Sequence, residues 1–432
     1  MGKEYLQPPR GVRDIVGEEA ELYEYLINEF KETARLHGYK PVIPPTIEYY
    51  KLFEAKSGEE IRKSMYVFED KAGRVLALRP EVTASITRIY LRKLRGEPKP
   101  IRLYYVAQCF RYEEPQYARY REFWQAGLEI IGDKDINSDV SSAFTASYFL
   151  DRVGVKHYYV VGNVAFYRLL LTKADISVEK QDHILHLLDK REVDKALAEV
   201  KKLTTQEYFE AFSSLVEKPL DKLEDFLKEY KKLFGEDSGK FREEIEKTIS
   251  FIEILKQLGY KAIYDPKLVR GLTYYTSIIY EYKVPEKIKT SIGGGGRYDN
   301  LTTVYGGPPE YSTGLALGLD RIALVLSNSK DKISSLEKVL IITQKKIPLR
   351  YAYEVLRVLL DNNISAWVYR TDKIGKGLSL ANKKGVLITI ILGEKEYESR
   401  QVTIKNMVEG KQVIKPFNEF IETIKDILRT SE

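Results

Sequence analysis

The amino-acid sequence predicts an α+β protein, in which a mainly antiparallel sheet flanked by helices is followed by a smaller α/β domain. Three observations support this fold class. Strand-like and helical segments alternate irregularly over residues 1–171, without the regular strand–helix–strand repeat of a doubly wound sheet. Residues 172–256 are rich in Lys, Glu and regularly spaced Leu, and they contain no strand signal. Beyond the polar linker Ser327–Ser335, strand and helix signals alternate regularly.

The N-terminal elements follow from apolar spacing and from Pro and Gly. Leu22, Leu26 and Phe30 recur at helical spacing, and Gly38 ends that helix. Proline at the first position of a helix costs no hydrogen bond, so Pro80 can open the next one. The predicted elements are a helix over Gly17–His37, an extended segment over Tyr39–Thr46, a helix from Pro80 to about Leu94, and strands over Ile101–Glu113 and Arg119–Ile131.

The residue composition changes at three points along the chain, and these changes predict the domain boundaries. We expect a first part of the main domain over 1–171, a helical insertion over 172–256, a second part of the main domain over 257–326, and a C-terminal domain over 336–432. Gly293–Gly296 predicts a tight turn between strands, because no Gly-Lys-Ser/Thr phosphate loop follows it. The other elements expected here are a strand over Leu272–Val284, a helix over Gly318–Leu326, a strand over Val339–Thr343, a helix over Pro348–Asn362 and a strand over Gly385–Leu392.

Composition limits the functional classes. At 432 residues the chain exceeds one ordinary domain, and two or three are expected. No apolar run approaches the roughly 18 residues that a membrane helix needs, and Met1–Ala20 lacks the apolar core of a secretory signal. The single cysteine, Cys109, cannot form an internal disulfide, which favours a reducing compartment. A location in the cytoplasm, with no membrane partner, is therefore expected.

The positive charge is concentrated in the C-terminal quarter. Lys330–Glu432 holds 19 Lys/Arg and 13 Asp/Glu, an excess of +6 that equals the net charge of the whole chain. A basic module on a neutral body is typical of a polyanionic partner, while an ordinary solvated surface gives the same composition. The basic, glycine-containing stretch Lys373–Lys384 likewise fits either RNA contact or a solvated loop.

The segment Arg119–Ile131 carries the clearest functional pattern. Side chains alternate faces along a strand. One face carries Arg119, Arg121, Phe123, Gln125, Gly127 and Glu129, and the other carries Tyr120, Glu122, Trp124, Ala126, Leu128 and Ile130. The second face is apolar in its second half and suits burial under helices. The first face offers cations for phosphates, an aromatic ring for a base, and an amide and a carboxylate for an amine. A solvated surface strand is the alternative for this stretch alone.

Five stretches resemble the histidyl form of the class II aminoacyl-tRNA synthetases. Phe110–Glu113 with Arg119–Glu129 resembles motif 2, Gly314–Arg321 motif 3, and Gly38–Tyr49 motif 1. Leu268–Tyr275 and Gly294–Asn300 resemble signatures peculiar to the histidyl family, and Pro9–Asp14 also fits. The resemblance covers the chain from residue 9 to the C-terminal domain, with the motifs in the family's order. It implies a class II catalytic sheet and an anticodon-binding C-terminal domain.

The resemblance also implies roles for individual residues. Arg270 and Arg111 would contact the α-phosphate and the substrate carboxylate as the main catalytic groups, with Arg270 the larger contributor. The implied histidine site comprises Glu81, Val82, Thr83, Arg111, Gln125, Glu129, Arg270, Tyr274, Tyr275 and Tyr298. In it, Glu81, Thr83 and Gln125 would take the ammonium group, and Glu129 and Tyr275 would read the imidazole. The implied ATP site comprises Arg111, Arg119, Arg121, Phe123 and Arg321, with adenine between Phe123 and Arg321.

The implied reaction joins L-histidine to tRNA(His) with ATP as a substrate, Mg²⁺ on the phosphates and a homodimer as the expected assembly. The chain departs from the family pattern at Val82, Glu114, Ala118, Thr273 and Asp320. Glu114 and Ala118 bear on how the tRNA acceptor end is read, and Thr273 bears on what orients Arg270.

Two other functions fit parts of the pattern. Family-like chains serve as histidine-sensing regulatory subunits of ATP phosphoribosyltransferase, and related tRNA-sensing domains are attached to protein kinases. The basic C-terminal module and the three arginines Arg111, Arg270 and Arg321 favour the enzyme over the regulatory subunit, and the sequence contains no kinase segment that would favour the tRNA-sensing domain. His183 and His186 have a spacing that a metal pair could use, but no cysteine is near, so two histidines on a helix surface are expected and no metal site is predicted.

Overall fold

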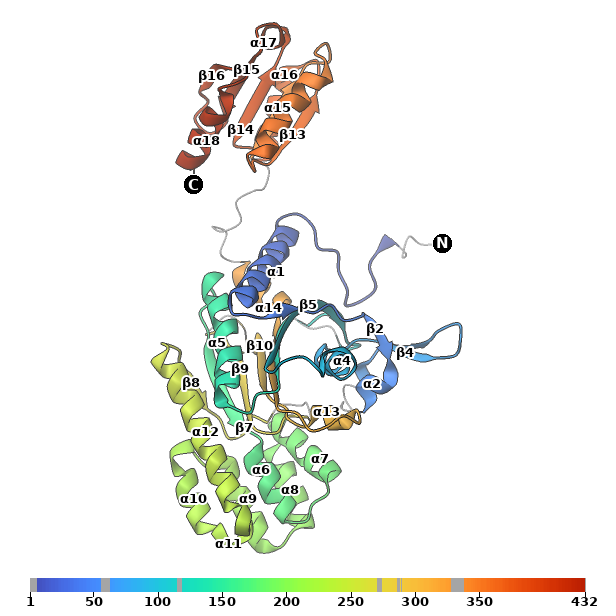
Figure 1. Cartoon of the computed structure of the whole chain (residues 1–432), viewed down its shortest axis with the longest axis vertical. Coiled ribbons are helices and arrows are strands. Elements are labelled where there is room, and N and C mark those ends of the chain that lie inside the picture. The colour runs from blue at the N-terminus through green and yellow to red at the C-terminus, as the bar shows by residue number, and fades with distance from the viewer. Residues whose placement is uncertain are drawn as a thin grey trace. The chain divides into compact units, whose positions relative to one another are not determined.

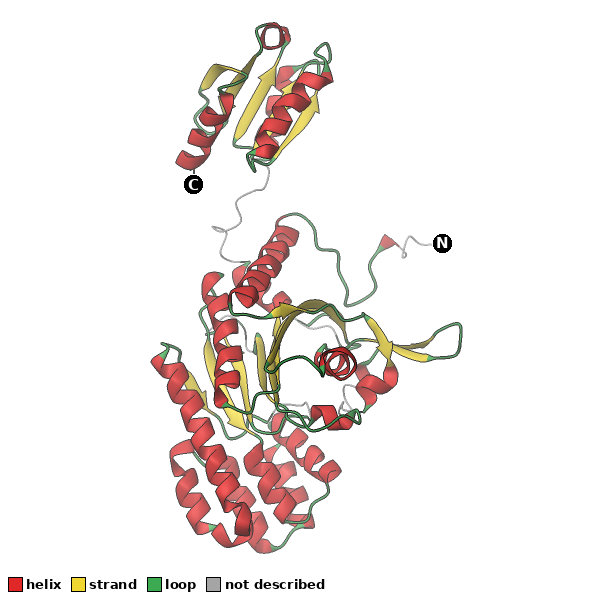
Figure 2. Ribbon diagram, viewed as in Figure 1, coloured by secondary structure: helices red, strands yellow, loops and turns green. Residues whose placement is uncertain are grey.

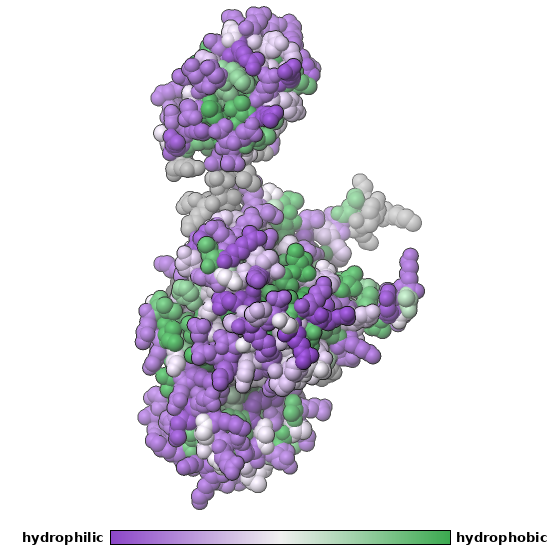
Figure 3. All heavy atoms as spheres, in the orientation of Figure 1, coloured by the Kyte–Doolittle hydropathy of each residue, from purple (hydrophilic) through white to green (hydrophobic). Residues whose placement is uncertain are grey.

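The computed structural model describes residues 6–55, 63–114, 119–269, 274–285, 288, 290–327 and 338–431. The chain divides into two compact units, Met1–Lys330 and Asp331–Glu432 (Figure 1). Hydrophilic side chains cover most of the visible face of each unit (Figure 3). In the described residues, no helix is both long and apolar enough to cross a membrane.

A mixed sheet of eight strands forms the centre of the first unit. Its strand order is β1 (Lys40–Pro41), β5 (Ile101–Phe110), β6 (Glu122–Ile131), β11 (Ser312–Gly318), β10 (Gly293–Arg297), β9 (Ile278–Lys283), β7 (Tyr158–Asn163) and β8 (Ala262–Tyr264). The five pairings from β5 to β7 are antiparallel, and only the outer pairings β1–β5 and β7–β8 are parallel. This arrangement confirms the predicted, mainly antiparallel sheet.

Helices cover both faces of this sheet (Figure 2). The helices α1 (Glu18–Leu36), α5 (Ile136–Arg152) and α14 (Leu319–Leu326) contact β6. They cover the apolar side chains Ala126, Leu128 and Ile130, all at most 1% exposed. On the opposite face, α4 (Thr83–Ile89) and the π-helical turn Tyr90–Leu94 pack on side chains of β5. The alternation along β6 therefore separates a buried core face from a face that is free for a site.

Two local predictions were wrong. The helix expected from Pro80 begins at Thr83, and the Glu81 carboxylate accepts the Ala84 N–H at 3.1 Å in front of it. The glycine cluster predicted as a turn is the strand β10, which pairs with both β9 and β11. A Cβ atom on Gly295 would lie 2.2 Å from the Gly314 carbonyl oxygen, so this strand needs residues without side chains.

A small antiparallel sheet lies outside the main one. It consists of β2 (Ile47–Tyr49), β4 (Val75–Leu78) and β3 (Val67–Glu69), in that order, next to the helix α2 (Tyr50–Glu54). None of these three strands was predicted, because each is only three or four residues long.

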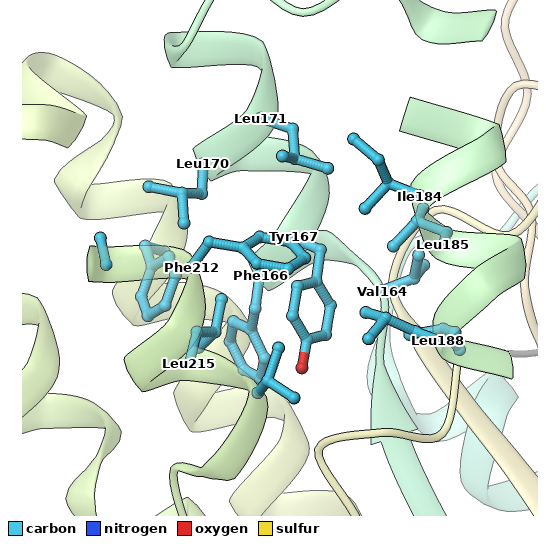
Figure 4. Close-up of a cluster of buried hydrophobic side chains, with 14 of the residues drawn as sticks. Val164, Phe166, Tyr167, Leu170, Leu171, Ile184, Leu185, Leu188, Phe212 and Leu215 are labelled. Atoms are coloured by element: carbon cyan, nitrogen blue, oxygen red, sulfur yellow. The ribbon is translucent and has the colours of Figure 1, made fainter. Parts of the chain in front are cut away.

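Residues 165–257 form a layer of helices around an apolar core that extends to Ile279 of β9 and to Tyr298. The helices are α6 (Ala165–Lys173), α7 (Val178–Asp189), α8 (Val193–Leu203), α9 (Gln206–Glu217), α10 (Leu223–Glu229), α11 (Lys231–Phe234) and α12 (Ser238–Gln257). Figure 4 shows how Phe166, Leu170 and Phe212 meet inside this layer, each at most 1% exposed. Residues 172–256 are all described, and they contain no strand. The apolar spacing therefore serves a helical core, while Lys and Glu face outward.

The second unit is a five-stranded sheet covered by helices. Its strand order is β13 (Ala366–Arg370), β12 (Val339–Thr343), β14 (Ile388–Leu392), β15 (Gln401–Asn406) and β16 (Gln412–Pro416), and its helices are α15 (Leu349–Asp361), α16 (Ile374–Lys383), α17 (Glu394–Glu398) and α18 (Phe420–Ser431). The first three strands are parallel, and the last two form an antiparallel hairpin. The predicted α/β character of this unit is confirmed.

Candidate active site

A cavity of about 170 Å³ opens on the odd-numbered face of β6, where Phe123 and Gln125 line it. Strand register determines the rest of the floor. Gly127 lies opposite Tyr105 of β5 and Ala316 of β11, and Gln125 lies opposite Gly318. Small residues thus occupy the middle of the sheet, and they leave space above it for a ligand.

Glycine is required at two positions of this floor. A Cβ on Gly127 would lie 2.2 Å from Cζ of Tyr105, and a Cβ on Gly314 would lie 1.8 Å from Oε2 of Glu129. Real Cβ atoms do not approach other atoms so closely. Gly314 therefore gives the Glu129 carboxylate its place under the cavity.

Glu129 is 1% exposed and does not itself line the cavity, but it is hydrogen-bonded to two residues that do, Thr83 and Tyr298. The Thr83 hydroxyl donates a hydrogen bond to its Oε1 at 2.8 Å, and the Tyr298 hydroxyl donates to its Oε2. Burial and the neighbouring Glu129 charge raise the pKa of Tyr298 well above its usual value, so the phenol remains a donor. A buried carboxylate held by two hydroxyl groups can receive a further N–H or a cation.

Three tyrosines wall this end of the cavity. The ring centroids of Tyr274 and Tyr275 are 4.8 Å apart, and those of Tyr274 and Tyr298 are 5.6 Å apart in an edge-on arrangement. All three line the cavity. Such rings suit a flat, partly polar side chain, because they offer both aromatic faces and hydroxyl groups.

The start of α4 brings Glu81 and Thr83 to the same end. Both line the cavity and are at most 9% exposed. Val82, between them, points instead into the apolar cluster of Ile86 and Tyr90 and does not line the cavity. The structure thus brings together two of the three residues predicted from this turn.

The other end of the cavity is cationic. Arg111 donates from Nε to the Pro80 carbonyl at 2.9 Å, and its guanidinium lies 5.2 Å from the ring centroid of Phe123. Arg321 donates from Nη1 to the Ser291 carbonyl at 2.6 Å. Burial, with Arg119 and Arg111 nearby, lowers the pKa of Arg321. Cations that repel one another in a partly buried space favour a bound polyanion.

Arg119 lies at the mouth of this end. It lines the cavity with a side chain that is 46% exposed, and its nearest carboxylate, Glu113, is 3.8 Å away. Arg121 does not line the cavity, contrary to the expectation from strand alternation. Its guanidinium donates to the carbonyls of Glu113 and Arg10 and lies 3.8 Å from the Tyr112 ring centroid. The alternation fails there because β6 begins only at Glu122.

Two predicted residues cannot be placed, and some lining residues were not predicted. Arg270 and Thr273 lie outside the described residues. Tyr120, which was predicted on the opposite face of the segment, also lines the cavity. Several lining residues were missed by the sequence reasoning, namely Tyr105, Ser291, Ile292, Gly293, Leu315, Ala316 and Gly318. They reach the cavity through strand pairing between distant segments. The glycines of β10 and β11 were the one available signal, since they indicate close approach of backbone to a ligand.

Comparisons with known proteins identify the family of this chain. Residues 11–322 match the family model described as histidyl-tRNA synthetase, and residues 338–427 match that of an anticodon binding domain. A histidine–tRNA ligase of Sulfolobus acidocaldarius is 38% identical over 429 residues, which are 98% of each chain.

Solved structures give the same result. An apo histidyl-tRNA synthetase of S. aureus is 26% identical, with a TM-score of 0.68 over 97% of this chain and 99% of that one. A histidyl-tRNA synthetase of Nostoc sp. PCC 7120, 20% identical, has a TM-score of 0.77 over 98% and 99% of the two chains and supports the fold. With one family model covering most of the first unit and relatives above 35% identity along the whole chain, the protein belongs to the histidyl-tRNA synthetase family.

Proposed function

We propose that this chain is a histidine–tRNA ligase. It activates L-histidine with ATP to histidyl-adenylate and transfers the histidyl group to the 3′ adenosine of tRNA(His). The observation that carries the proposal is the polarity of the cavity. One end rests on the buried Glu129 carboxylate, and the other holds the cations Arg111, Arg119 and Arg321.

Histidine is assigned to the Glu129 end. The carboxylate accepts an imidazole N–H, and the Tyr275 hydroxyl serves the other ring nitrogen. Glu81, Thr83 and Gln125 take the ammonium group, and Tyr274 and Tyr298 wall the ring. A site with buried polar readers rejects analogues strongly, because a wrong side chain leaves these groups unpaired.

ATP is assigned to the cationic end. Adenine stacks between Phe123 and Arg321, while Arg119 holds the outer phosphates and Arg111 contacts the α-phosphate. Arg121 is not assigned to the phosphates, because its guanidinium donates to the carbonyls of Glu113 and Arg10. Arg270 keeps its assignment as the main catalytic cation as a prediction from the sequence.

In the first step, a carboxylate oxygen of histidine attacks the α-phosphorus, and the bond to the bridging oxygen of diphosphate breaks. No side chain becomes covalent, so catalysis comes from positioning and from stabilising the charge on the equatorial oxygens. In the second step, a ribose hydroxyl of the terminal adenosine attacks the carbonyl carbon, and AMP leaves.

Mg²⁺ is implied by the family. This ion commonly uses one or two carboxylates together with the phosphates of a nucleotide. Glu113 fits, since it lines the cavity beside Arg119 with a side chain 36% exposed. Among the described residues, no group of three His, Cys, Asp or Glu could hold a metal by itself. When bound, the ion would neutralise phosphate charge beside the arginines.

The assembly is proposed to be a homodimer. In the segment that resembles motif 1, Ile43, Ile47 and Tyr49 are 93%, 47% and 56% exposed. Exposed apolar side chains that lie within seven residues of one another support an interaction surface in this segment. Sedimentation equilibrium of the purified chain tests this proposal: a dimer mass supports it, and a monomer at micromolar concentration contradicts it.

The domain division expected from the sequence is proposed with the same function. The catalytic domain comprises 1–171 and 257–326, the helical insertion comprises 172–256, and the anticodon-binding domain comprises 336–432. The basic excess of the last segment supports tRNA binding there. The cytoplasm stays the predicted location.

The direct test is charging of tRNA. Purified protein is incubated with ATP, Mg²⁺, labelled histidine and either a tRNA(His) transcript or an unrelated tRNA. We expect acid-precipitable label on tRNA(His) only. Absence of charging under conditions where the protein is folded would refute the proposal and favour a regulatory, histidine-sensing role.

A further inference from the structure

An N-terminal arm, residues 9–14, binds both limbs of the hairpin that leads from β5 into β6. On the outgoing limb, the Arg121 N–H donates to the Gly11 carbonyl at 2.7 Å, and the Arg121 guanidinium donates to the Arg10 carbonyl at 3.2 Å. On the incoming limb, Arg10 pairs with Glu114 at 3.1 Å. The arm therefore contacts the chain at Glu114, after β5, and at Arg121, before β6.

Arg13 connects this arm to two residues of the cavity wall. Its guanidinium lies 4.1 Å from the ring centroid of Tyr120, and its Nη2 lies 3.3 Å from Oδ1 of Asp320. The Tyr23 hydroxyl of α1 donates to the same Oδ1 at 2.7 Å, and Glu19 pairs with the Arg13 Nη1. Arg13 itself does not line the cavity, whereas Tyr120 and Asp320 do.

Both carboxylate oxygens of Asp320 accept hydrogen bonds from this cluster or from β6. The Oδ2 atom accepts the Trp124 N–H at 2.7 Å, and Asp320 as a whole is 4% exposed. Asp320 thereby joins α1, the arm and the first residues of β6 immediately before Arg321. The cluster is almost wholly buried on the Asp320 side, while the Arg13 side chain is 25% exposed. Charge-assisted hydrogen bonds in such surroundings are among the stronger ones.

The cluster lies at one end of the cavity. Tyr120 lies two residues before β6, Trp124 is near the beginning of the strand, and Glu129 is near its end. At roughly 3.4 Å per residue, the five steps along the strand from Trp124 to Glu129 span about 17 Å. A disturbance of the arm is therefore transmitted to Tyr120, Asp320 and Arg321, and the Glu129 end keeps its own support from Thr83 and Tyr298.

We propose that Arg13 is a positioning residue for ATP, which acts through Tyr120 and Asp320 on the nucleotide end of the cavity and leaves the histidine end unaffected. This inference rests on the proposed function for the assignment of the two ends. Arginine is required rather than a generic cation, because its planar guanidinium can stack on Tyr120 and at the same time donate to Asp320 and Glu19.

The test measures ATP and histidine binding separately, by isothermal titration calorimetry on the full chain. Arg13→Ala and Arg13→Lys should each raise the Kd for ATP roughly tenfold, since each loses a cation–π contact together with a fixed hydrogen bond. The Kd for histidine should stay within about twofold of the wild-type value. Tyr120→Leu should behave alike, and its effect should not add to that of Arg13→Ala, because the two side chains act as a unit.

Arg35→Ala is the matched control, since Arg35 is an exposed arginine in the last turn of α1 and lines no part of the cavity. It should leave both constants unchanged. If Arg13→Lys and Tyr120→Leu bind ATP like the Arg35 variant, the inference is overturned. An equal weakening of ATP and histidine binding overturns it as well, because it indicates general loss of structure.

If Arg13→Ala does not fold, the ATP affinities of Arg13→Lys and Tyr120→Leu test the inference instead. The proposed function fails separately, since a wild-type chain that binds ATP but never charges tRNA refutes the ligase assignment without touching the Arg13 result.

Discussion

Glu129 is a charged group placed almost entirely out of water. At 1% exposure it would be costly without partners, and the hydroxyls of Thr83 and Tyr298 supply two. Its position also depends on Gly314 of the neighbouring strand, which leaves the space that the carboxylate occupies. These contacts hold the carboxylate in place, and its proposed ligand is the imidazole of histidine.

Glu129→Gln should weaken histidine binding roughly 10- to 100-fold, because a hydrogen bond to a charged acceptor is lost while the shape is kept. ATP binding should change little. Calorimetric titration with each substrate measures both constants. Glu122→Gln, on the opposite face of the same strand, is the control and should match the wild type. An unchanged histidine Kd in the Glu129 variant would contradict the assignment of this end.

Cys109 provides a prediction on pH. It is fully buried, and its thiol donates to the Gln125 Oε1 at 3.3 Å. Burial raises its pKa to about 12 from 9.0, against smaller lowering by Arg111 and Arg79. A raised pKa in the folded state means that the neutral thiol stabilises the fold below pH 9, and that this contribution falls as the pH rises from 9 towards 12.

At pH 8 the native chain should therefore resist alkylation, because the thiolate is the reactive form and it is scarce. Iodoacetamide labelling followed by mass spectrometry measures this: no adduct is expected in buffer, and one adduct per chain is expected in urea. Rapid labelling of the folded protein would contradict the buried position of this residue.

At the scale of elements, a buried ion pair joins β10 to α5. Arg297 donates from Nε to Oδ2 of Asp139 at 3.0 Å and from its other nitrogens to the carbonyls of Asp133 and Asp135. The two residues are 4% and 1% exposed. Burial raises the pKa of Asp139, although Arg297 opposes this. The pair fixes the end of β10, from which Tyr298 reaches Glu129.

Arg297→Met should lower the free energy of unfolding by about 3–5 kcal/mol, because it leaves the Asp139 charge buried without its partner. Urea denaturation measures the loss. Adding Asp139→Leu should recover part of it, since this removes the more deeply buried of the two carboxylates, Asp139 and Asp299, that pair with Arg297. A single variant as stable as the wild type would show that the pair does not hold this strand.

Elements with a periodic pattern could be predicted from the sequence. Leu22, Leu26 and Phe30 marked α1, and the apolar run at Val339 marked β12 to the residue. Short or unusual elements could not be predicted. β10 consists of four glycines and an arginine, and only its pairing with β9 and β11 makes it a strand. Pairing between distant segments is a tertiary property that no local window contains.

The same limit applies to the site. Alternation along β6 correctly predicted that Phe123 and Gln125 share a face, and both line the cavity. It failed at Arg121, because the hairpin bends before the strand begins. Tyr105 lines the cavity because β5 pairs with β6 at Gly127. Asp320 lines it because α14 begins beside the cavity. The contribution of the N-terminal arm could not be inferred from spacing, since 307 residues separate Arg13 from Asp320.

At the scale of the whole molecule, we expect one of the two units to form the adenylate and the other to bind most of the tRNA. The second unit has its own apolar clusters on both faces of its sheet. Removal of residues 330–432 should leave histidine-dependent adenylate formation intact. Binding of tRNA should weaken at least tenfold and lose most of its salt dependence, because that segment carries the net positive charge. Filter binding across a salt series measures this, and unchanged tRNA affinity would contradict the division.

The central claim is that the cavity on β6 forms histidyl-adenylate from histidine and ATP. Exchange of labelled diphosphate into ATP tests it most directly, since exchange requires the adenylate to form and revert at one site. We expect exchange with histidine, none with the other standard amino acids, and a large loss in Glu129→Gln. No exchange with histidine, or exchange supported equally by another amino acid, would contradict the account.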